Sequence, residues 1–303
     1  MIRYNPKSWM SLVFDVYSRY VMRQLLPMMV FIAIFTAAVE FVLKELIKLQ
    51  YEGTLAFHSL LGILLGLFLV LRTNTAYDRW WEGRKHWGRL VNDCRNLALK
   101  LSGILKYEED VKFFKCMIPN IVFGMKEHLR DSIRVGEMDF ISEQHKVQVI
   151  KSKHRPNAIN KMMYNRIQDL KERNEIDGND YFIIDKELKG FTDIIGACER
   201  IKSTPLPHSY SMFIKKFVFF YITSLPFALV WQFGYWAVPI ITVMFYFLFS
   251  IELIAEEIED PFGKDVNDLP LDDLSIKIRN NVQEIFDAEN ITQLESSQKT
   301  ANV

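Results

Sequence analysis

The sequence predicts an all-α membrane protein with a large helical region in water, and three observations lead to this fold class. Hydrophobic residues make up 50% of the 303 residues, and the most apolar stretches lie toward the two ends of the chain. The runs 55–71 and 217–236 carry no formal charge, and each is long enough to cross a bilayer as a helix. The charged middle repeats apolar residues at helical spacing, as in residues 104–134 and 186–202.

The chain begins with a predicted amphipathic helix and a first membrane span. Residues 1–24 carry one apolar stripe, which consists of Trp9, Leu12, Val13, Val16, Tyr17 and Tyr20. Residues 25–43 are apolar except for Glu40 near the far end, and they predict a transmembrane helix over about 25–46.

The second span belongs to one very long predicted helix. Its helical pattern continues without a proline from residues 55–71 into the charged residues that follow, so its membrane part is predicted over about 55–81. Gly62 and Gly66 lie in this span, and small residues at such positions predict the close approach of another helix.

Two more spans are predicted near the C-terminus, over 217–236 and 237–251, with the turn-prone segment QFGYWAVP between them. The last helix is expected to end at Asp260-Pro261. Between the second and third spans, residues 135–182 are the most polar part of the middle region and are expected to hold its loops.

Four parts follow from this pattern: 1–81 with the first two spans, 82–214 as a helical cytoplasmic region, 215–258 with the last two spans, and 259–303 as an acidic loop and tail. Basic residues flank the spans on the side of the large region, for example Lys215 and Lys216, and the N-terminus is also basic. The positive-inside rule therefore predicts a multi-pass protein of the plasma (inner) membrane with both termini in the cytoplasm.

Composition and motifs argue against several classes of protein. Lys+Arg and Asp+Glu are balanced at 37 each, which disfavours nucleic acid as a partner. The sequence has no nucleotide-binding, hydrolase or metalloprotease signature, so we expect no enzyme activity. The cysteines (Cys94, Cys116 and Cys198) form no CxxC pair, and the six histidines show no metal-ligand spacing.

The second span has one face that repeats every four residues, formed by Ser59, Ile63, Leu67 and Leu71. If several copies of the chain surrounded an axis, this face would give rings of apolar side chains, and such rings can gate ions by dewetting. The alternative is that the leucines face lipid or pack inside a bundle.

Acidic residues gather after the fourth span, and they are Glu256, Glu257, Glu259, Asp260, Asp265, Asp268, Asp272 and Asp273. Carboxylates spaced along a loop suit a hard cation such as calcium. The loop does not follow the twelve-residue EF-hand pattern, and the alternative is a solvated acidic face beside basic side chains.

Three motifs resemble those of the bestrophin family and in particular its bacterial members. They are RTNTAYDRWWEGR at 72–84, STPLP at 203–207 and DPFG at 260–263, and the resemblance extends over about residues 5–285. It implies a homopentamer around a central pore, a hydrophobic neck at Ile63, Leu67 and Leu71, and a pore mouth at Ser59. A second constriction is implied lower in the cytoplasmic part, and 176–184 is the segment to search.

The resemblance also bears on ions. Animal members resemble calcium-gated chloride channels, and their calcium clasp would fall on Glu257, Asp260, Asp265 and Asp268, although the animal acidic run is denser. Bacterial members are thought to favour monovalent cations, so the choice between cations and chloride stays open.

The function that we expect from the sequence is thus a channel that lies in a lipid membrane and passes monovalent ions. No cofactor is certain from the sequence, and a divalent cation such as calcium at the acidic loop is the candidate. The alternative is a membrane scaffold that binds a partner through its cytoplasmic helices. A coupled transporter would normally carry an ionisable residue in mid-span, and only Glu40 comes near.

Overall fold

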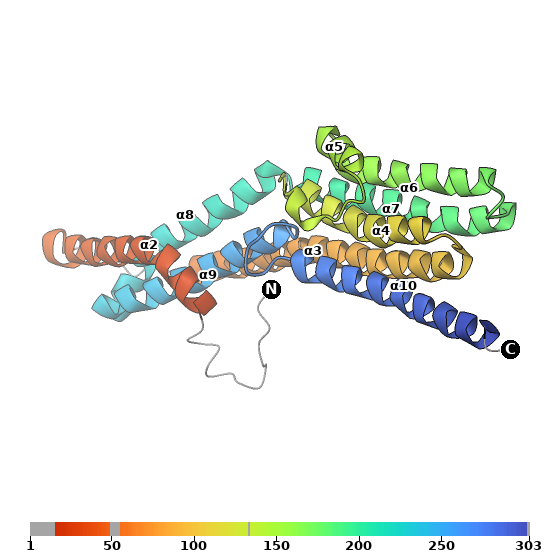
Figure 1. Ribbon diagram of the computed structural model, residues 1–303. Coiled ribbons are helices and arrows are strands. Elements are labelled where there is room, and N and C mark those ends of the chain that lie inside the picture. The colour runs from red at the N-terminus through yellow and green to blue at the C-terminus, as the bar shows by residue number, and fades with distance from the viewer. Residues whose placement is uncertain (1–15, 49–54, 133, 302–303) are drawn as a thin grey trace. The chain divides into compact units, whose positions relative to one another are not determined.

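The computed structural model describes residues 16–48, 55–132 and 134–301, and these ranges contain helices and no strand (Figure 1). The all-α prediction is therefore confirmed. The stripe expected over 1–24 lies mainly outside the described residues. Its last positions belong to α2 (Val16–Phe41), which also contains most of the first predicted span.

The contacts divide the chain into two compact units. Unit 1 holds the described residues up to Trp80 together with Pro205–Pro261 and Asp265–Asp268, and unit 2 holds Trp81–Thr204, Phe262–Lys264 and the chain from Leu269 onward.

Unit 1 is built from α2, the first part of α3 (Ala56–Ile104), α8 (His208–Phe233) and α9 (Ala237–Glu259). Helix α2 packs on both α8 and α9, and α8 packs on α9 (Figure 1). All four helices contribute to one apolar core, formed by Val21, Leu25, Ile32, Leu65, Leu69, Ile214, Val218, Tyr221, Ile222, Leu225, Leu229, Val230, Ala237, Ile241 and Phe245. A short π-helical segment, η1 (Val42–Leu46), continues α2.

A tight turn joins α8 to α9, as the sequence predicts. The turn is the 3-10 segment η3 (Gly234–Trp236), and Gly234 has a φ of 55°, a left-handed conformation that favours glycine. A Cβ at this position would lie 3.2 Å from Lys44 Nζ, so the space is also tight.

Among the described residues, three helical stretches are long and apolar enough to cross a membrane. They are Tyr20–Leu46, Ala56–Ile104 and His208–Glu259, and the third contains both α8 and α9. The long second helix is confirmed, because α3 runs for 49 residues. The expected end of the last span is also confirmed, because α9 ends at Glu259 with Asp260 as its C-cap.

Unit 2 is a helical bundle. The second part of α3 buries Trp87, Leu90, Cys94, Leu97 and Leu101, which follow one another at alternating steps of three and four residues. Helix α4 (Glu108–Leu129) packs on α6 (Arg155–Glu172) and on α10 (Leu271–Ala301), and α6 packs on α7 (Gly178–Ser203) (Figure 1).

The stretch 135–182, which was expected to hold loops of the middle region, contains several loops but is mostly helical. This stretch contains η2 (Val135–Glu137), α5 (Glu143–Lys151), all of α6 and the start of α7. Its polar composition conceals an apolar stripe on α6, whose buried members are Ile159, Met162, Met163, Ile167 and Leu170. Local caps also define the helices, since Ser142 Oγ accepts the His145 N–H at 3.2 Å.

Candidate functional site

Helix α3 has two different faces within unit 1. Leu65 and Arg72 are each 1% exposed, and they point into the unit. On the opposite side, Ile63, Leu67 and Leu71 are 71%, 57% and 47% exposed in the single chain. The sequence-predicted neck residues therefore lie together on an exposed apolar face that no part of the described chain covers.

This face becomes polar at both ends. Ser59, the predicted pore mouth, is exposed one turn before Ile63. Asn74 and Asp78 are exposed at the other end, seven residues after Leu67 and Leu71. The sequence reading did not single out Asn74 or Asp78, although their spacing from the leucines was the signal that could have found them.

A buried ionic network holds the other face of α3. Arg72 Nη2 lies 2.7 Å from Glu259 Oε2, and Arg72 Nε lies 3.6 Å from Glu252 Oε1, so the arginine joins α3 to two turns of α9. The remaining oxygen of Glu259 accepts the Leu206 N–H at 2.8 Å, and the Glu259 carbonyl accepts from Arg79 Nε at 3.1 Å. Charges buried at this depth persist only when they are paired and hydrogen-bonded.

The sequence reading missed this network. The signal was an arginine placed directly after a long uncharged run, but its partner Glu259 lies 187 residues further along the chain.

Glu40, which the sequence placed near the edge of its span, is fully buried beside Lys44, with Lys44 Nζ 3.2 Å from its Oε1.

The two glycines of the second span differ. A Cβ on Gly62 would lie 2.7 Å from Tyr221 Oη, which confirms the close approach of α8 at this point. A Cβ on Gly66 would meet nothing within 4 Å, so the prediction of close approach is wrong there.

The acidic loop after α9 is organised around Asp268. This residue is 2% exposed, and its Oδ2 accepts the Asp265 N–H at 2.6 Å. Its Oδ1 is buried and has no hydrogen-bond partner among the described residues. Burial is the main cause that raises the pKa of Asp268 to about 7, and the carboxylates of Asp265, Asp260 and Glu257 contribute to this rise against the opposing effect of the Asp265 N–H.

The other predicted clasp residues lie around this loop in different settings. Glu257 Oε2 accepts from Asn267 Nδ2 at 2.8 Å, while the Asn267 carbonyl accepts the indole N–H of Trp80 at 2.9 Å. Asp260 and Asp265 are exposed. Their ligand atoms do not form a compact set, because within the described ranges the group of three such side chains that lies within 4.8 Å is elsewhere, in unit 2.

The segment 176–184, which the resemblance to the family indicates for a lower constriction, lies at the start of α7. Asp177 caps the helix, and its carboxylate accepts the Asn179 and Asp180 N–H groups at 2.7 Å each. Phe182 is 78% exposed on the next turn, and Ile183 is also exposed.

Comparisons with known proteins identify the family of the chain. Residues 1–284 match the model of the family described as bacterial/fungal bestrophin protein. A protein of Ralstonia nicotianae named voltage-dependent anion channel-forming protein is 34% identical over 236 residues, which cover 75% of this chain and 76% of that protein. A protein of the same descriptive name from Nostoc is 33% identical over 249 residues, which cover 80% of this chain and 81% of the relative.

A solved structure shows the same fold. The crystal structure of a bacterial bestrophin homologue from Klebsiella pneumoniae superposes with a TM-score of 0.79 at 27% identity, and the match covers 85% of this chain and 97% of that one. The names of these relatives describe channel-forming proteins, in agreement with the expectation that the chain is not an enzyme. The chain is a membrane protein of the bacterial and fungal bestrophin family.

Proposed function

We propose that the protein is an ion channel whose narrow neck is lined by Ile63, Leu67 and Leu71. The observation that carries this proposal is the exposed apolar face of α3, which lies opposite a face that is fully packed and anchored by a buried arginine. In a chain of this family, such a face is suited to meet copies of itself around an axis. A ring of aliphatic side chains sets a barrier that an ion crosses only by shedding water.

The assembly that we propose is a homopentamer in the plasma (inner) membrane. Four helices would cross the bilayer, because the third apolar stretch contains two helices joined by the turn at Gly234. Both termini and unit 2 would lie in the cytoplasm, as the positive-inside rule predicts. Native mass spectrometry should give close to five times the chain mass of 35.7 kDa.

For the permeant ion we propose monovalent anions such as chloride. The relatives are named as anion channel-forming proteins, and the neck itself is uncharged. An apolar ring favours weakly hydrated ions, which include the larger halides. Asp78 acts in the opposite direction if it also lines the pathway, because a ring of carboxylates favours cations.

For the acidic loop we propose that Asp268 is the central ligand of a calcium site. Its unsatisfied Oδ1 is the kind of buried oxygen that a hard cation neutralises. Asp265, Asp260 and Glu257 are the neighbouring carboxylates whose charge would favour a cation there.

The test is planar-bilayer recording of the purified protein under a NaCl gradient. We expect a reversal potential near that of chloride, and larger conductance or open probability in Ile63→Ala, Leu67→Ala and Leu71→Ala. Phe220→Ala is the matched control, since Phe220 is a large apolar residue on α8 that is 65% exposed and lies outside the proposed neck. It should leave the currents unchanged.

Three other outcomes would each contradict a part of this proposal. A reversal near the sodium potential would overturn anion selectivity while keeping the channel. Neck variants with wild-type currents would show that these residues do not line the pore. Silence from a verified pentamer in all conditions would favour a scaffold that binds a partner through unit 2.

A further inference from the structure

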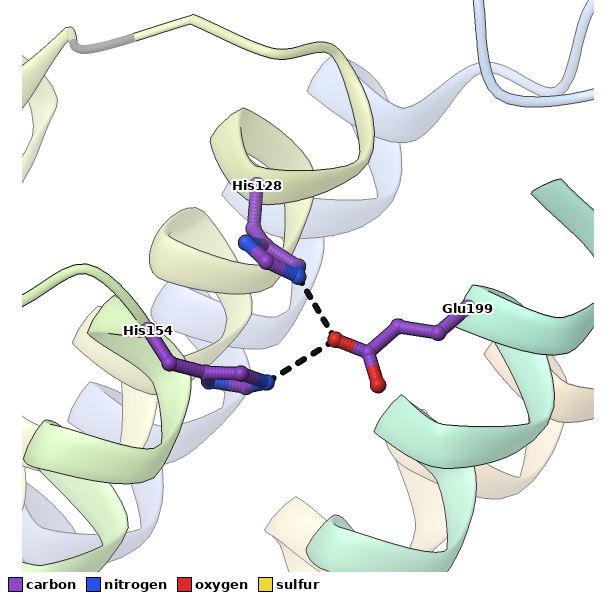
Figure 2. A group of neighbouring side chains, drawn as sticks. All are labelled: His128, His154 and Glu199. Atoms are coloured by element: carbon purple, nitrogen blue, oxygen red, sulfur yellow. Dashed lines mark hydrogen bonds and ion pairs between the residues drawn. The ribbon is translucent and has the colours of Figure 1, made fainter. Parts of the chain in front are cut away.

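A group of three side chains in unit 2 has the composition of a metal site. His128 Nε2 lies 2.6 Å from Glu199 Oε1, and His154 Nε2 lies 2.8 Å from the same oxygen (Figure 2). The two imidazole rings face each other with their centroids 4.6 Å apart. Both histidines therefore point their Nε2 atoms at one carboxylate.

Three different helices bring these residues together. His128 lies in the last turn of α4, His154 is the N-cap of α6, and Glu199 lies near the end of α7 (Figure 2). The three residues are far apart in sequence, so no local motif reveals them. Packing of α6 against both α4 and α7 is what makes the group converge.

We propose that His128, His154 and Glu199 form a binding site for a divalent transition-metal ion of the zinc class. Two imidazoles and one carboxylate form a known set of protein ligands for zinc sites that keep one position for water. Calcium and magnesium prefer oxygen ligands alone, so the two histidines select against them.

The geometry needs only small movements to admit the ion. The three ligand atoms lie within 4.8 Å of one another. Neighbouring ligand atoms of a tetrahedral zinc ion are about 3.3 Å apart, as follows from bond lengths of about 2.0–2.1 Å. The histidines therefore have to move away from Glu199 Oε1 by about 0.5–0.7 Å, which a rotamer adjustment supplies.

An ion and its water can reach the group. The side chains of His128, His154 and Glu199 are 26%, 33% and 36% exposed. Cys198, the neighbour of Glu199, is fully buried and does not belong to the group of converging ligand atoms, so the fourth ligand is a water molecule.

Metal binding changes one local hydrogen bond. His154 Nδ1 accepts the Asn157 N–H at 3.2 Å, so in the metal-free protein the proton of the neutral ring is on Nε2, which faces Glu199. To bind a metal through Nε2, the ring must carry its proton on Nδ1 and release Asn157. Because Asn157 is exposed, water can satisfy its amide.

The decisive experiment is zinc titration of the full-length protein in detergent after removal of any polyhistidine tag and treatment with a chelator. Calorimetry and elemental analysis should give one Zn²⁺ per chain. Glu199→Gln and His128→Gln should each weaken binding by at least tenfold, since loss of even an outer-shell partner costs about 10–100-fold. His86→Gln is the matched control, because His86 lies 3.8 Å from Glu82 in a simple i,i+4 pair, and it should bind Zn²⁺ like wild type.

A second measurement uses the wild-type protein, so its result does not depend on whether the variants fold. Co²⁺ added to the wild-type protein should give the intense visible bands of a four-coordinate site with nitrogen and oxygen ligands. Zinc binding that appears only at millimolar concentration, or that survives in both ligand variants, would overturn the site. Binding is read on the purified protein, so this result does not depend on whether the chain conducts ions.

Discussion

The buried carboxyl of Asp268 makes the stability of unit 1 depend on pH, with a sign that follows from its environment. Burial raises its pKa from 3.8 to about 7. Between these two pH values the folded protein keeps a proton that the unfolded chain has already released. Stability is therefore lost as the pH rises through this window, and the full loss is present above pH 7.

The size of the effect follows from the same numbers. A difference of about 3 units corresponds to about 4 kcal/mol at 1.36 kcal/mol per unit, and this is an upper value because acidic neighbours relax when the loop moves. A change of 2 kcal/mol already shifts the melting temperature by about 4–8 °C in a chain of this size. The effect is therefore measurable by thermal unfolding.

The assay compares Asp268→Asn with wild type at pH 5 and pH 8, with tryptophan fluorescence as the readout. Asparagine cannot ionise. The melting temperature of the variant relative to wild type should therefore be at least about 4 °C higher at pH 8 than at pH 5. Asp131→Asn is the control, because its carboxylate is 82% exposed and lies outside the acidic loop. An equal difference at both pH values would refute the reasoning.

Calcium added at pH 8 to wild type and to Asp268→Asn tests the calcium proposal by the same melting experiment. If Asp268 binds the ion, a concentration of 100 times the dissociation constant stabilises wild type by about 2.7 kcal/mol. Asp268→Asn should show no such gain. A wild-type melting curve that calcium leaves unchanged would remove the calcium proposal and leave the pH effect standing.

Two further predictions concern the packing of unit 1. Glu259→Gln should lower the melting temperature strongly, because breaking a buried ion pair costs about 3–5 kcal/mol, whereas Glu256→Gln should have little effect because that carboxylate is 55% exposed. Similar melting temperatures for the two variants would contradict the buried network. Gly62→Ala should destabilise by about 1–3 kcal/mol through the contact of its Cβ with Tyr221 Oη, and adding Tyr221→Phe should restore much of the loss. Gly66→Ala is its control, and equal effects at the two glycines would show that the contact does not matter.

Much of the fold was accessible from the sequence because it depends on local signals. The uncharged runs predicted the membrane helices, the lack of proline after residue 71 predicted the length of α3, and QFGYWAVP predicted the turn at Gly234. In α6 the same reasoning failed, because charged and polar residues of its exposed face interrupt the buried apolar stripe along the sequence.

The candidate sites also differ in how far the sequence alone reveals them. The neck face was readable because its residues repeat along one helix, and their exposure in the chain is compatible with the pore role that stays to be tested. The pairing of Arg72 with Glu259 and the convergence of His128, His154 and Glu199 depend on contacts between distant helices. Spacing along a sequence carries no information about such contacts.

Arg72 follows Leu71 directly, so the contacts of the arginine fix the rotation of α3 about its axis at the proposed neck. Its guanidinium is locked to Glu259 on one side of α3, while Leu71 faces away on the other. A turn of the helix by about 20° would move the Cβ of a neck leucine by about 1 Å, given the radius of an α-helix. In the proposed channel, the bore of the neck would thus be set by a charge pair outside it, and any event that neutralises Glu259 would free the rotation of α3 that fixes the position of the leucines.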